Sequence, residues 1–371
     1  MSPAVNTYAF INAKLRARIS KLLSKSTMMQ IAQAHSLDEA VHVLDQTAFA
    51  PAVKRYSETG DLLIMELELE RVHQETLREV RRYAQQFTND AVTRFVDAFL
   101  QRFALTNVKN AIRLWYERTL RERTVEDKLP YLIRTGLRHD IPVEGIVNAM
   151  RPQELVKVLE ATPFGSVVAT HIDEVTERSS LLPLEIALDR WYYDQLRGAM
   201  ESLNRRDGEM ARRLVGIEID VINVNWLVRL QTYYKMDSSE SGEMLLSGGA
   251  LVDRATLQRS AESSRPAQNL TELFGKRLGT PISSGDDREG DQGRSEQRDR
   301  MSNQTRTLAL LEVMLQDLLL HECRRSLGGY PFTIGVILAY TSLKEQEVRM
   351  IKTALNGKYY DLDPERIGAL L

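Results

Sequence analysis

The chain has 371 residues, more than the roughly 250–300 at which a single hydrophobic core stops growing, so we expect more than one domain. A net charge of −2, with 43% hydrophobic and 27% charged residues, is typical of a globular protein and disfavours nucleic acid as the main ligand. The single cysteine, Cys323, excludes an internal disulfide framework and suits a reducing compartment. No apolar run approaches the roughly 20 residues that cross a bilayer, so any association with a membrane would go through a partner protein.

Helical periodicity runs through most of the chain. In residues 61–87, apolar side chains such as Met65 and Leu69 recur every three or four positions, charged residues fill the other faces, and Asp61 is a predicted N-cap. No hairpin signal is present, and residues 242–252 are the one candidate for a short strand. The sequence therefore predicts an all-α protein. Further amphipathic segments lie at 183–200, 305–327 and 343–358.

One region departs from this pattern. Residues 283–303 contain a single large apolar side chain, Met301, among Gly, Ser and charges of both signs. Such a composition cannot bury enough surface to offset the entropy of ordering the chain. Residues 237–249 are also rich in Ser and Gly and are typical of a loop. We therefore predict a flexible loop at about 237–303, of which residues 283–303 act as a solvated spacer.

Three sequence patterns recur along the chain. The first is an Asn followed by an Arg six positions later, the second ends in Thr-x-Phe or a related turn, and the third is a long helix that carries a Glu near its start. The first occurs at Asn12 and Arg18, Asn107 and Arg113, and Asn223 and Arg229; the second at 37–49, 152–164 and, more weakly, 272–282; the third at 65–78, 184–197 and, in part, 312–324.

The patterns come in the same order each time, and chance would not preserve that order. The sequence therefore predicts three similar helical units at 1–90, 91–206 and 207–371, the last including the flexible loop and a closing helix. In the closing helix Glu347 takes the place of the Asn and Thr353 that of the Arg, so the fourth copy of the first pattern is degenerate. Arrays of helical units offer extended concave surfaces and are typical of scaffolds.

The basic residues of the repeated helices have two interpretations. They either contact a partner protein or pair inside the protein with acidic residues such as Glu66 and Glu185. An Arg six positions after an Asn lies about 600° further round the helix, so the two side chains need not touch. The candidates for partner contact are Arg16, Arg18, Lys109, Arg113 and Arg229.

No arrangement of catalytic, metal-binding or cofactor-binding residues stands out. His321 is followed by Glu322 but by no second histidine, so the H-E-x-x-H spacing of zinc enzymes is missing. Gly275-Lys276 lacks the upstream glycine of a phosphate-binding loop, and Arg277 stands where a Ser or Thr would hold magnesium. We therefore predict no catalytic site, no metal and no cofactor. A free cytosolic helical-repeat adaptor is an alternative function, and an enzyme with an unrecognised site is a disfavoured third.

Four segments together resemble a known family. They are "YAFINAKLRARISKLL" near the N-terminus, "NVKNAIRLWYE", "EIDVINVNWLVRLQTYYK" and, as the most specific, the C-terminal "YPFTIGVILAYTSLKEQEVRMIKTALNGK". In this order they resemble the C subunit of the vacuolar- and archaeal-type rotary ATPases, which is named the d subunit in the eukaryotic vacuolar enzyme. The resemblance extends from Tyr8 to about Leu362 and is weakest at residues 237–303.

The resemblance implies a fold and a function. The fold would be three similar helical subdomains arranged as a funnel around a central opening. The protein would sit as a socket on the cytoplasmic face of the membrane ring of proteolipid subunits, bound peripherally, and would receive the tip of the central stalk. It would have no catalytic site and would transmit torque between the nucleotide-driven stalk and the ion-carrying ring.

Overall fold

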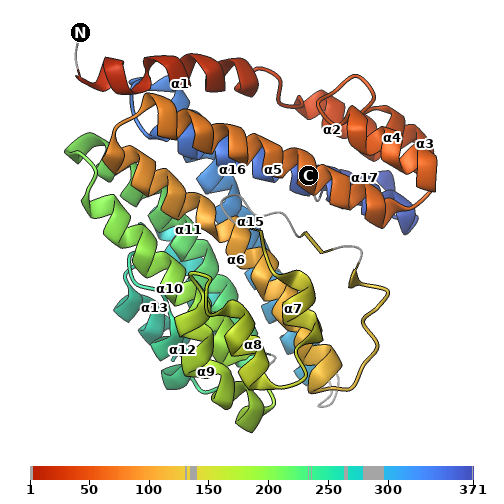
Figure 1. Ribbon diagram of the computed structural model, residues 1–371, viewed down its shortest axis with the longest axis vertical. Helices are drawn as coiled ribbons and strands as arrows, with labels where there is room; N and C mark the ends of the chain where they lie inside the picture. The colour runs from red at the N-terminus through yellow and green to blue at the C-terminus, as the bar shows by residue number, and fades with distance from the viewer. Residues whose placement is uncertain are drawn as a thin grey trace. The chain divides into compact units, whose positions relative to one another are not determined.

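The computed structural model describes residues 3–129, 132–133, 140–232, 234, 236–262, 266–278, 296–369 and 371, and within helices it gives the backbone alone for residues 3, 228–229, 231–232, 238, 261, 266–267, 277–278, 296–310 and 369. Over these residues the chain forms seventeen helices and no strand, so the all-α prediction is confirmed and the strand predicted at 242–252 is wrong (Figure 1). The helices are α1 Pro3–Ile19, α2 Lys25–Gln33, α3 Leu37–His42, α4 Ala50–Thr59, α5 Leu62–Phe87, α6 Asp90–Thr119, α7 Val143–Asn148, α8 Pro152–Leu159, α9 Gly165–Arg178, α10 Leu182–Glu201, α11 Arg205–Thr232, α12 Ser238–Met244, α13 Arg254–Ala261, α14 Pro266–Leu278, α15 Glu296–Gly328, α16 Gly335–Tyr359 and α17 Pro364–Ala369.

The chain divides into two compact units. The first unit comprises Met1–Leu203 together with Tyr340–Leu371, and the second comprises Asn204–Ala339. The three helical units expected at 1–90, 91–206 and 207–371, and their arrangement as a funnel, stay predictions.

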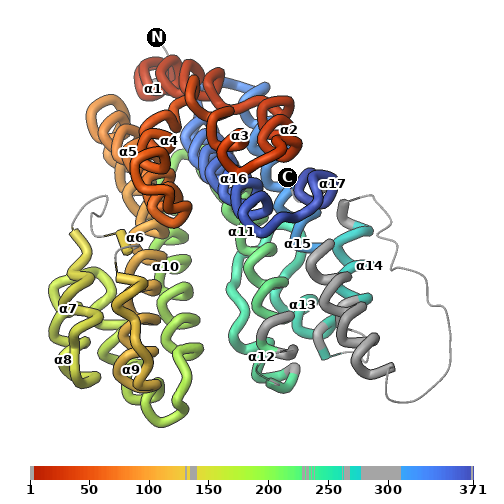
Figure 2. Tube along the Cα trace, turned by 90° about the vertical axis from the view of Figure 1, so that its right-hand side faces the viewer, coloured from red at the N-terminus to blue at the C-terminus, as the bar shows by residue number. Residues whose placement is uncertain are grey.

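Similar helix pairings recur within the two units. We define repeat 1 as α2–α5, repeat 2 as α6–α10 and repeat 3 as α11–α15. In each repeat the last helix packs against the one before it, as α4 with α5, α9 with α10, and α14 with α15. In repeats 2 and 3 the last helix also packs against the first, as α6 with α10 and α11 with α15. Figure 2 shows α9 and α10 side by side in repeat 2.

The second sequence pattern has the same local structure in repeats 1 and 2. Thr47 donates a hydrogen bond of 2.7 Å to the carbonyl three residues back and accepts one of 3.1 Å from the Phe49 amide. Thr162 makes the same two bonds, at 2.6 and 3.3 Å, with the equivalent carbonyl and with Phe164. Both phenylalanines are buried and precede the first residues of α4 and α9. The threonine therefore closes a turn that directs an aromatic side chain into the core.

The helices that precede these turns also begin alike. The Glu39 carboxylate accepts a hydrogen bond of 2.7 Å from the His35 amide, and the Glu154 carboxylate accepts one of 2.8 Å from the Met150 amide. A glutamate in the first turn that bonds back to the entering chain pairs an amide left free by the helix. The matched glutamates of the sequence patterns thus have the same role.

The predicted loop at 237–303 is wrong over its first part, because α12, α13 and α14 lie there, and over 296–303, where α15 begins. Asp237 and Asp253 cap α12 and α13 by accepting hydrogen bonds from the amides three residues on, at 2.8 and 2.9 Å. Leu257 and Phe274 are buried in a core with Leu311 of α15. Helices α13 and α14 each bury one narrow apolar face, with Leu257 in α13 and Leu270 and Phe274 in α14, whereas α12 has a single large apolar residue, Met244. A Ser- and Gly-rich average over the segment hides these faces. Residues 279–295 lie outside the described residues.

Candidate functional site

A polar cavity of about 410 Å³ lies between α5, α6 and α16 in the first unit. It includes Asn107, one of the residues singled out by the repeated Asn and Arg spacing, and charged residues of both signs. Among the described residues its polar lining consists of Glu66, Glu70, His73 and Gln74 of α5, Thr106, Asn107 and Asn110 of α6, and Glu345, Arg349 and Lys352 of α16.

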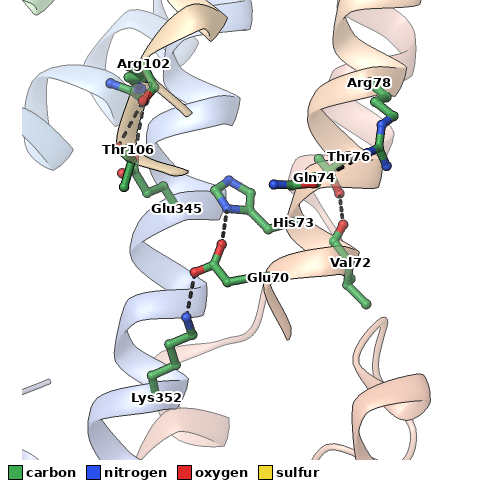
Figure 3. A network of polar contacts seen from close by, with 10 residues as sticks. All are labelled: Glu70, Val72, His73, Gln74, Thr76, Arg78, Arg102, Thr106, Glu345 and Lys352. Carbon is green, nitrogen blue, oxygen red and sulfur yellow. Dashed lines mark hydrogen bonds and ion pairs between the residues drawn. The ribbon is translucent and has the colours of Figure 1, made fainter. Parts of the chain in front are cut away.

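Glu70 connects two of the helices around this cavity (Figure 3). Its carboxylate accepts a hydrogen bond of 2.6 Å from Lys352 Nζ, and His73 Nδ1 lies 3.6 Å from its other oxygen. Burial raises the pKa of Glu70, but His73 and Lys352 together outweigh it and lower the pKa to about 2. The carboxylate is therefore ionised at physiological pH, so it holds α16 to α5 and does not act as a proton donor.

His73 is 3% exposed and packs edge to face against Phe103 of α6, with ring centroids 5.1 Å apart. Its Nε2 has no hydrogen-bond partner among the described residues. The cavity combines this imidazole with a carboxylate already paired with a lysine, and no Ser, Thr or Cys nucleophile lies within hydrogen-bond reach of His73 in the residues the structure covers. The imidazole and the paired carboxylate therefore connect α5 with α6 and α16.

Arg102 joins α6 to α16 on the same side of the molecule. Its guanidinium donates to Glu345 at 2.8 Å (Figure 3). It also lies over the rings of Phe99 and Phe103, 4.4 and 4.8 Å from their centroids. A guanidinium that is desolvated against aromatic faces gains more from both contacts than an exposed one does. Arg102 therefore fixes the relative position of the two helices.

A second network joins α6 to α10. Lys109 Nζ lies 2.8 and 2.9 Å from the two carboxylate oxygens of Asp189, and Arg113 Nε donates to Glu185 at 2.5 Å. Burial raises the pKa of Asp189, and Lys109 opposes this by stabilising the charged form. Arg113 also donates to Asn110 at 3.1 Å. Lys109 and Arg113, both predicted as partner-contact residues, are thus engaged inside repeat 2.

The same network recurs between α16 and α5. Glu66 and Glu70 occupy the positions of Glu185 and Asp189 in the third sequence pattern. Lys352 bonds Glu70 as Lys109 bonds Asp189, and Asn356 donates to Glu66 where Arg113 donates to Glu185. We infer that α16 takes the same place against α5 in repeat 1 that α6 takes against α10 in repeat 2, although α16 lies near the other end of the sequence.

This register corrects the predicted fourth copy of the Asn and Arg pattern. The counterparts of Lys109 and Arg113 are Lys352 and Asn356, so Thr353 does not replace the arginine. Glu347, predicted to stand in the place of the Asn, is buried, accepts a hydrogen bond of 2.6 Å from the Leu23 amide, and pairs with Lys344 at 2.6 Å.

The remaining predicted contact residues lie in different surroundings. Arg16 donates to Asn12 within α1 at 3.1 Å, and Arg18 donates to Glu79 of α5 at 2.7 Å. Glu79 lies thirteen residues beyond Glu66, more than three helical turns away, so Arg18 is not the structural counterpart of Arg113 and the predicted equivalence of these two copies is wrong. The side chain of Arg229 lies outside the described residues. Contact of Arg16, Arg18, Lys109, Arg113 and Arg229 with a partner stays a prediction, whereas internal pairing is formed by Arg18, Lys109 and Arg113.

The Asn of repeat 3 braces the backbone. Asn223 is buried, donates to the Leu246 carbonyl at 2.9 Å and accepts from the Leu246 amide at 2.8 Å. Both hydrogen-bonding groups of one backbone residue are therefore satisfied by one side chain. In this copy the repeated Asn therefore braces the backbone that follows α12.

Sequence reasoning named Glu66 as an internal acidic partner but missed Lys352 and Asn356 of α16, which bond Glu70 and Glu66 of α5. A signal for them exists in the sequence, because Val108-Lys109-Asn110-Ala111-Ile112 matches Ile351-Lys352-Thr353-Ala354-Leu355 in apolar pattern and in its lysine and alanine. In the part of the chain that the structure covers, no group of three His, Cys, Asp or Glu side chains could hold a metal ion. No described helix is both long and apolar enough to span a bilayer.

Comparisons with known proteins agree over nearly the whole chain. A family model described as ATP synthase (C/AC39) subunit matches residues 11–370. The C subunit of the A-type ATP synthase of Methanocaldococcus jannaschii is 23% identical over 98% of this chain and 86% of that protein. The proteins of the same name from Methanothermobacter thermautotrophicus and Haloferax volcanii are 25% identical over 95% of the chain and 29% identical over 74%, covering 84% and 72% of those proteins.

Proposed function

Because the chain belongs to the ATP synthase (C/AC39) subunit family, we propose that it is a non-catalytic central-rotor subunit of an A/V-type ATPase. In this role it is a socket that receives the central stalk and sits on the membrane ring of proteolipid subunits, on its cytoplasmic face, and transmits torque between ATP turnover and ion translocation. The observation that carries the proposal is the family match over residues 11–370, supported by relatives named as the C subunit of A-type ATP synthases, of which the chain covers 72–86%.

A torque-transmitting part must resist shear, and the pairings in the first unit suit that requirement. In repeats 1 and 2, long helices are joined by charged hydrogen bonds as well as by apolar packing: Lys352 with Glu70, Lys109 with Asp189, and Arg113 with Glu185. Closely packed cores deform little, and charge-assisted bonds fix the register of one helix on another. These contacts support a rigid coupling element.

The polar cavity supports the absence of catalysis in the proposal. Glu70 is ionised and paired with Lys352, and Glu345 is paired with Arg102. A general acid needs a pKa near the operating pH, and the value of about 2 for Glu70 lies far below it. We therefore assign these groups to packing and to the alignment of α5, α6 and α16.

A reconstituted rotary complex with and without the chain tests the proposal. With it, we expect ATP hydrolysis and ion transport to be coupled; without it, we expect ATP hydrolysis by the remaining subunits to continue while transport is lost. Retention of coupled transport without the chain would refute the socket. ATP turnover by the isolated chain would refute its non-catalytic role.

The same reconstitution separates the socket from the free adaptor. A free adaptor would leave both activities unchanged on omission and would fractionate with soluble complexes only. Release of the chain from membranes together with central-stalk subunits, by mild chaotropes, is the outcome that the socket predicts.

A further inference from the structure

The second unit has a surface rich in arginine, which none of the sites described above includes. It lies where the first turns of α11 meet the last turns of α15, and the two helices pack side by side (Figure 2). At about 100° per residue, the charged side chains that α11 exposes here lie within about one third of its circumference. We call it the arginine surface, and its exposed arginines are Arg205, Arg206, Arg212 and Arg213 of α11 and Arg324 and Arg325 of α15.

Glu322 of α15 shows how these arginines bind a carboxylate. One of its oxygens accepts a hydrogen bond of 2.7 Å from Arg213, and the other accepts one of 3.3 Å from Arg325. Burial raises the pKa of Glu322, but Arg213 and Arg325 together outweigh it and lower the pKa. The planar donor groups of a guanidinium match a carboxylate, and such charge-assisted bonds are stronger than neutral ones. Two arginines from two helices therefore hold this one carboxylate.

Three arginines of the surface have no carboxylate partner among the residues that the structure describes, namely Arg206, Arg212 and Arg324. The other acidic residues of these turns are already engaged. Glu209 accepts a hydrogen bond of 2.9 Å from the first arginine of α11, and Asp207 is buried and accepts one of 2.8 Å from a backbone amide. The surface therefore keeps positive charge that its own carboxylates do not neutralise.

The composition of the surface favours a protein over a membrane as its partner. Residues 204–234 and 311–339 contain no lysine, whereas surfaces that bind anionic lipid use lysine and arginine alike. Tyr330, which follows α15, is 43% exposed, and the Arg206 guanidinium lies over its ring, 4.5 Å from the centroid. Arginine and tyrosine are enriched at protein–protein interfaces and lysine is depleted there.

We propose that the arginine surface binds an acidic segment of another protein, whose Asp and Glu side chains bond Arg206, Arg212 and Arg324 as Glu322 bonds Arg213 and Arg325. The charge of the partner is complementary to the surface, and the guanidinium groups select carboxylates that they can bond in one plane. This inference goes beyond the proposed function and does not rest on it, because it follows from side chains of the second unit alone.

An oligoglutamate peptide labelled with fluorescein is the probe. Titrated with the full chain at low ionic strength and followed by fluorescence anisotropy, it should bind saturably. The triple variant Arg206→Gln, Arg212→Gln, Arg324→Gln should weaken binding by at least about tenfold. The matched control removes the same charge from exposed arginines elsewhere, as Arg55→Gln, Arg71→Gln, Arg178→Gln, and should stay within about twofold of the unaltered chain. Thermal melts by circular dichroism check that both variants fold.

A second triple variant separates guanidinium geometry from charge. Arg206→Lys, Arg212→Lys, Arg324→Lys keeps the charge but removes the planar donors, and should weaken peptide binding by at least about threefold.

Three outcomes would overturn the proposal. The first is binding that is absent up to about 1 mM, or weakened equally by the glutamine variant and its control. The second is equal binding by the lysine variant and the unaltered chain, because charge alone would then suffice. The third is that vesicles of phosphatidylcholine and phosphatidylserine sediment the unaltered chain but not the glutamine variant, because the occupant would then be a membrane.

Discussion

Repeats 1 and 2 share the same local structures, but the helix that pairs with the last helix of each repeat comes from a different part of the chain. Both have a threonine-closed turn before a buried phenylalanine and a last helix whose two acidic residues are held by a neighbouring helix. In repeat 2 that neighbour is α6, from the same stretch of sequence. In repeat 1 it is α16, whose Lys352 is 282 residues from Glu70. A repeated sequence thus specifies local structure and pairing chemistry, while the source of the completing helix differs.

The largest effect should come from the two buried phenylalanines. Phe49→Ala and Phe164→Ala each leave a cavity in the core and should each lower the free energy of unfolding by about 3–5 kcal/mol. If the repeats are equivalent, the two losses should agree within about 1 kcal/mol, as measured by chemical denaturation. Met150→Ala, at a side chain that is 72% exposed, is the control and should change it by less than about 0.5 kcal/mol. A loss below about 1 kcal/mol for either phenylalanine would argue against the equivalence.

Asp220 of repeat 3 extends the comparison to a third repeat and to the pH dependence of stability. In the register that pairs Asn223 with Met350 it corresponds to Glu347, and like Glu347 it accepts a backbone amide, that of Leu251 at 2.7 Å. Burial raises its pKa from 3.8 to about 6, although the backbone hydrogen bonds oppose this. An acid whose pKa is raised in the folded state favours the protonated form. Its contribution to stability is therefore complete below about pH 4 and is lost as the pH rises through about 6.

The free energy of unfolding should therefore fall by about 2–3 kcal/mol, through Asp220 alone, between pH 4 and pH 7. Asp220→Asn removes the titration, so the variant should lose this part of the pH dependence in denaturation curves recorded at both pH values. An unchanged pH dependence in the variant would show that Asp220 has an ordinary pKa.

Replacing the lysine of each network should lower the free energy of unfolding by a moderately different amount. Lys109→Met leaves Asp189 without its partner and should lower the free energy of unfolding by about 2–3 kcal/mol. Lys352→Met should cost about 1 kcal/mol, since both members of the Lys352–Glu70 pair are more exposed than those of the Lys109–Asp189 pair. Arg205→Ala, at a side chain 92% exposed, is a control without expected effect. A larger loss for Lys352→Met than for Lys109→Met would reverse the order that burial predicts.

Sequence reasoning anticipated the helices and the internal similarity. Met65 and Leu69 lie on the buried face of α5, and Asp61 caps that helix by accepting from the Leu63 amide at 2.8 Å. Helical periodicity and capping are local, so they are readable from a short window of sequence. The Thr47 and Thr162 turns were found for the same reason.

The sites that sequence reasoning missed depend on contacts distant along the chain. Asn12 and Arg18 share a spacing with Asn107 and Arg113, but the spacing does not fix which carboxylate each arginine meets. Lys352 and Glu70 lie far apart in sequence, and only folding brings them together. Helices α13 and α14 were missed because their apolar faces are narrow, and α12 was missed because it contains a single large apolar residue, Met244.

The smallest effects concern Gly198 of α10 and Glu79 of α5, which correspond in the register that pairs Glu185 with Glu66. Gly198→Ala places a methyl group in open space within a helix and should raise the free energy of unfolding by about 0.5–1 kcal/mol. The counterpart Glu79→Ala removes the bond to Arg18 at the surface and should lower it by up to about 1 kcal/mol. Thermal melts of both variants measure the difference in sign. Destabilisation by Gly198→Ala would contradict the open space found around this position.

Covalent attachment tests the proposed socket most directly. In a Cys323→Ser background, a single new surface cysteine is crosslinked to the central stalk and, in a second variant, to the proteolipid ring. If the chain turns together with both, ATP-driven ion transport should persist in each crosslinked complex at close to the rate of the reduced one. Transport that stops on crosslinking and returns on reduction would mean that the chain moves relative to the stalk or the ring, and would contradict a socket that transmits torque.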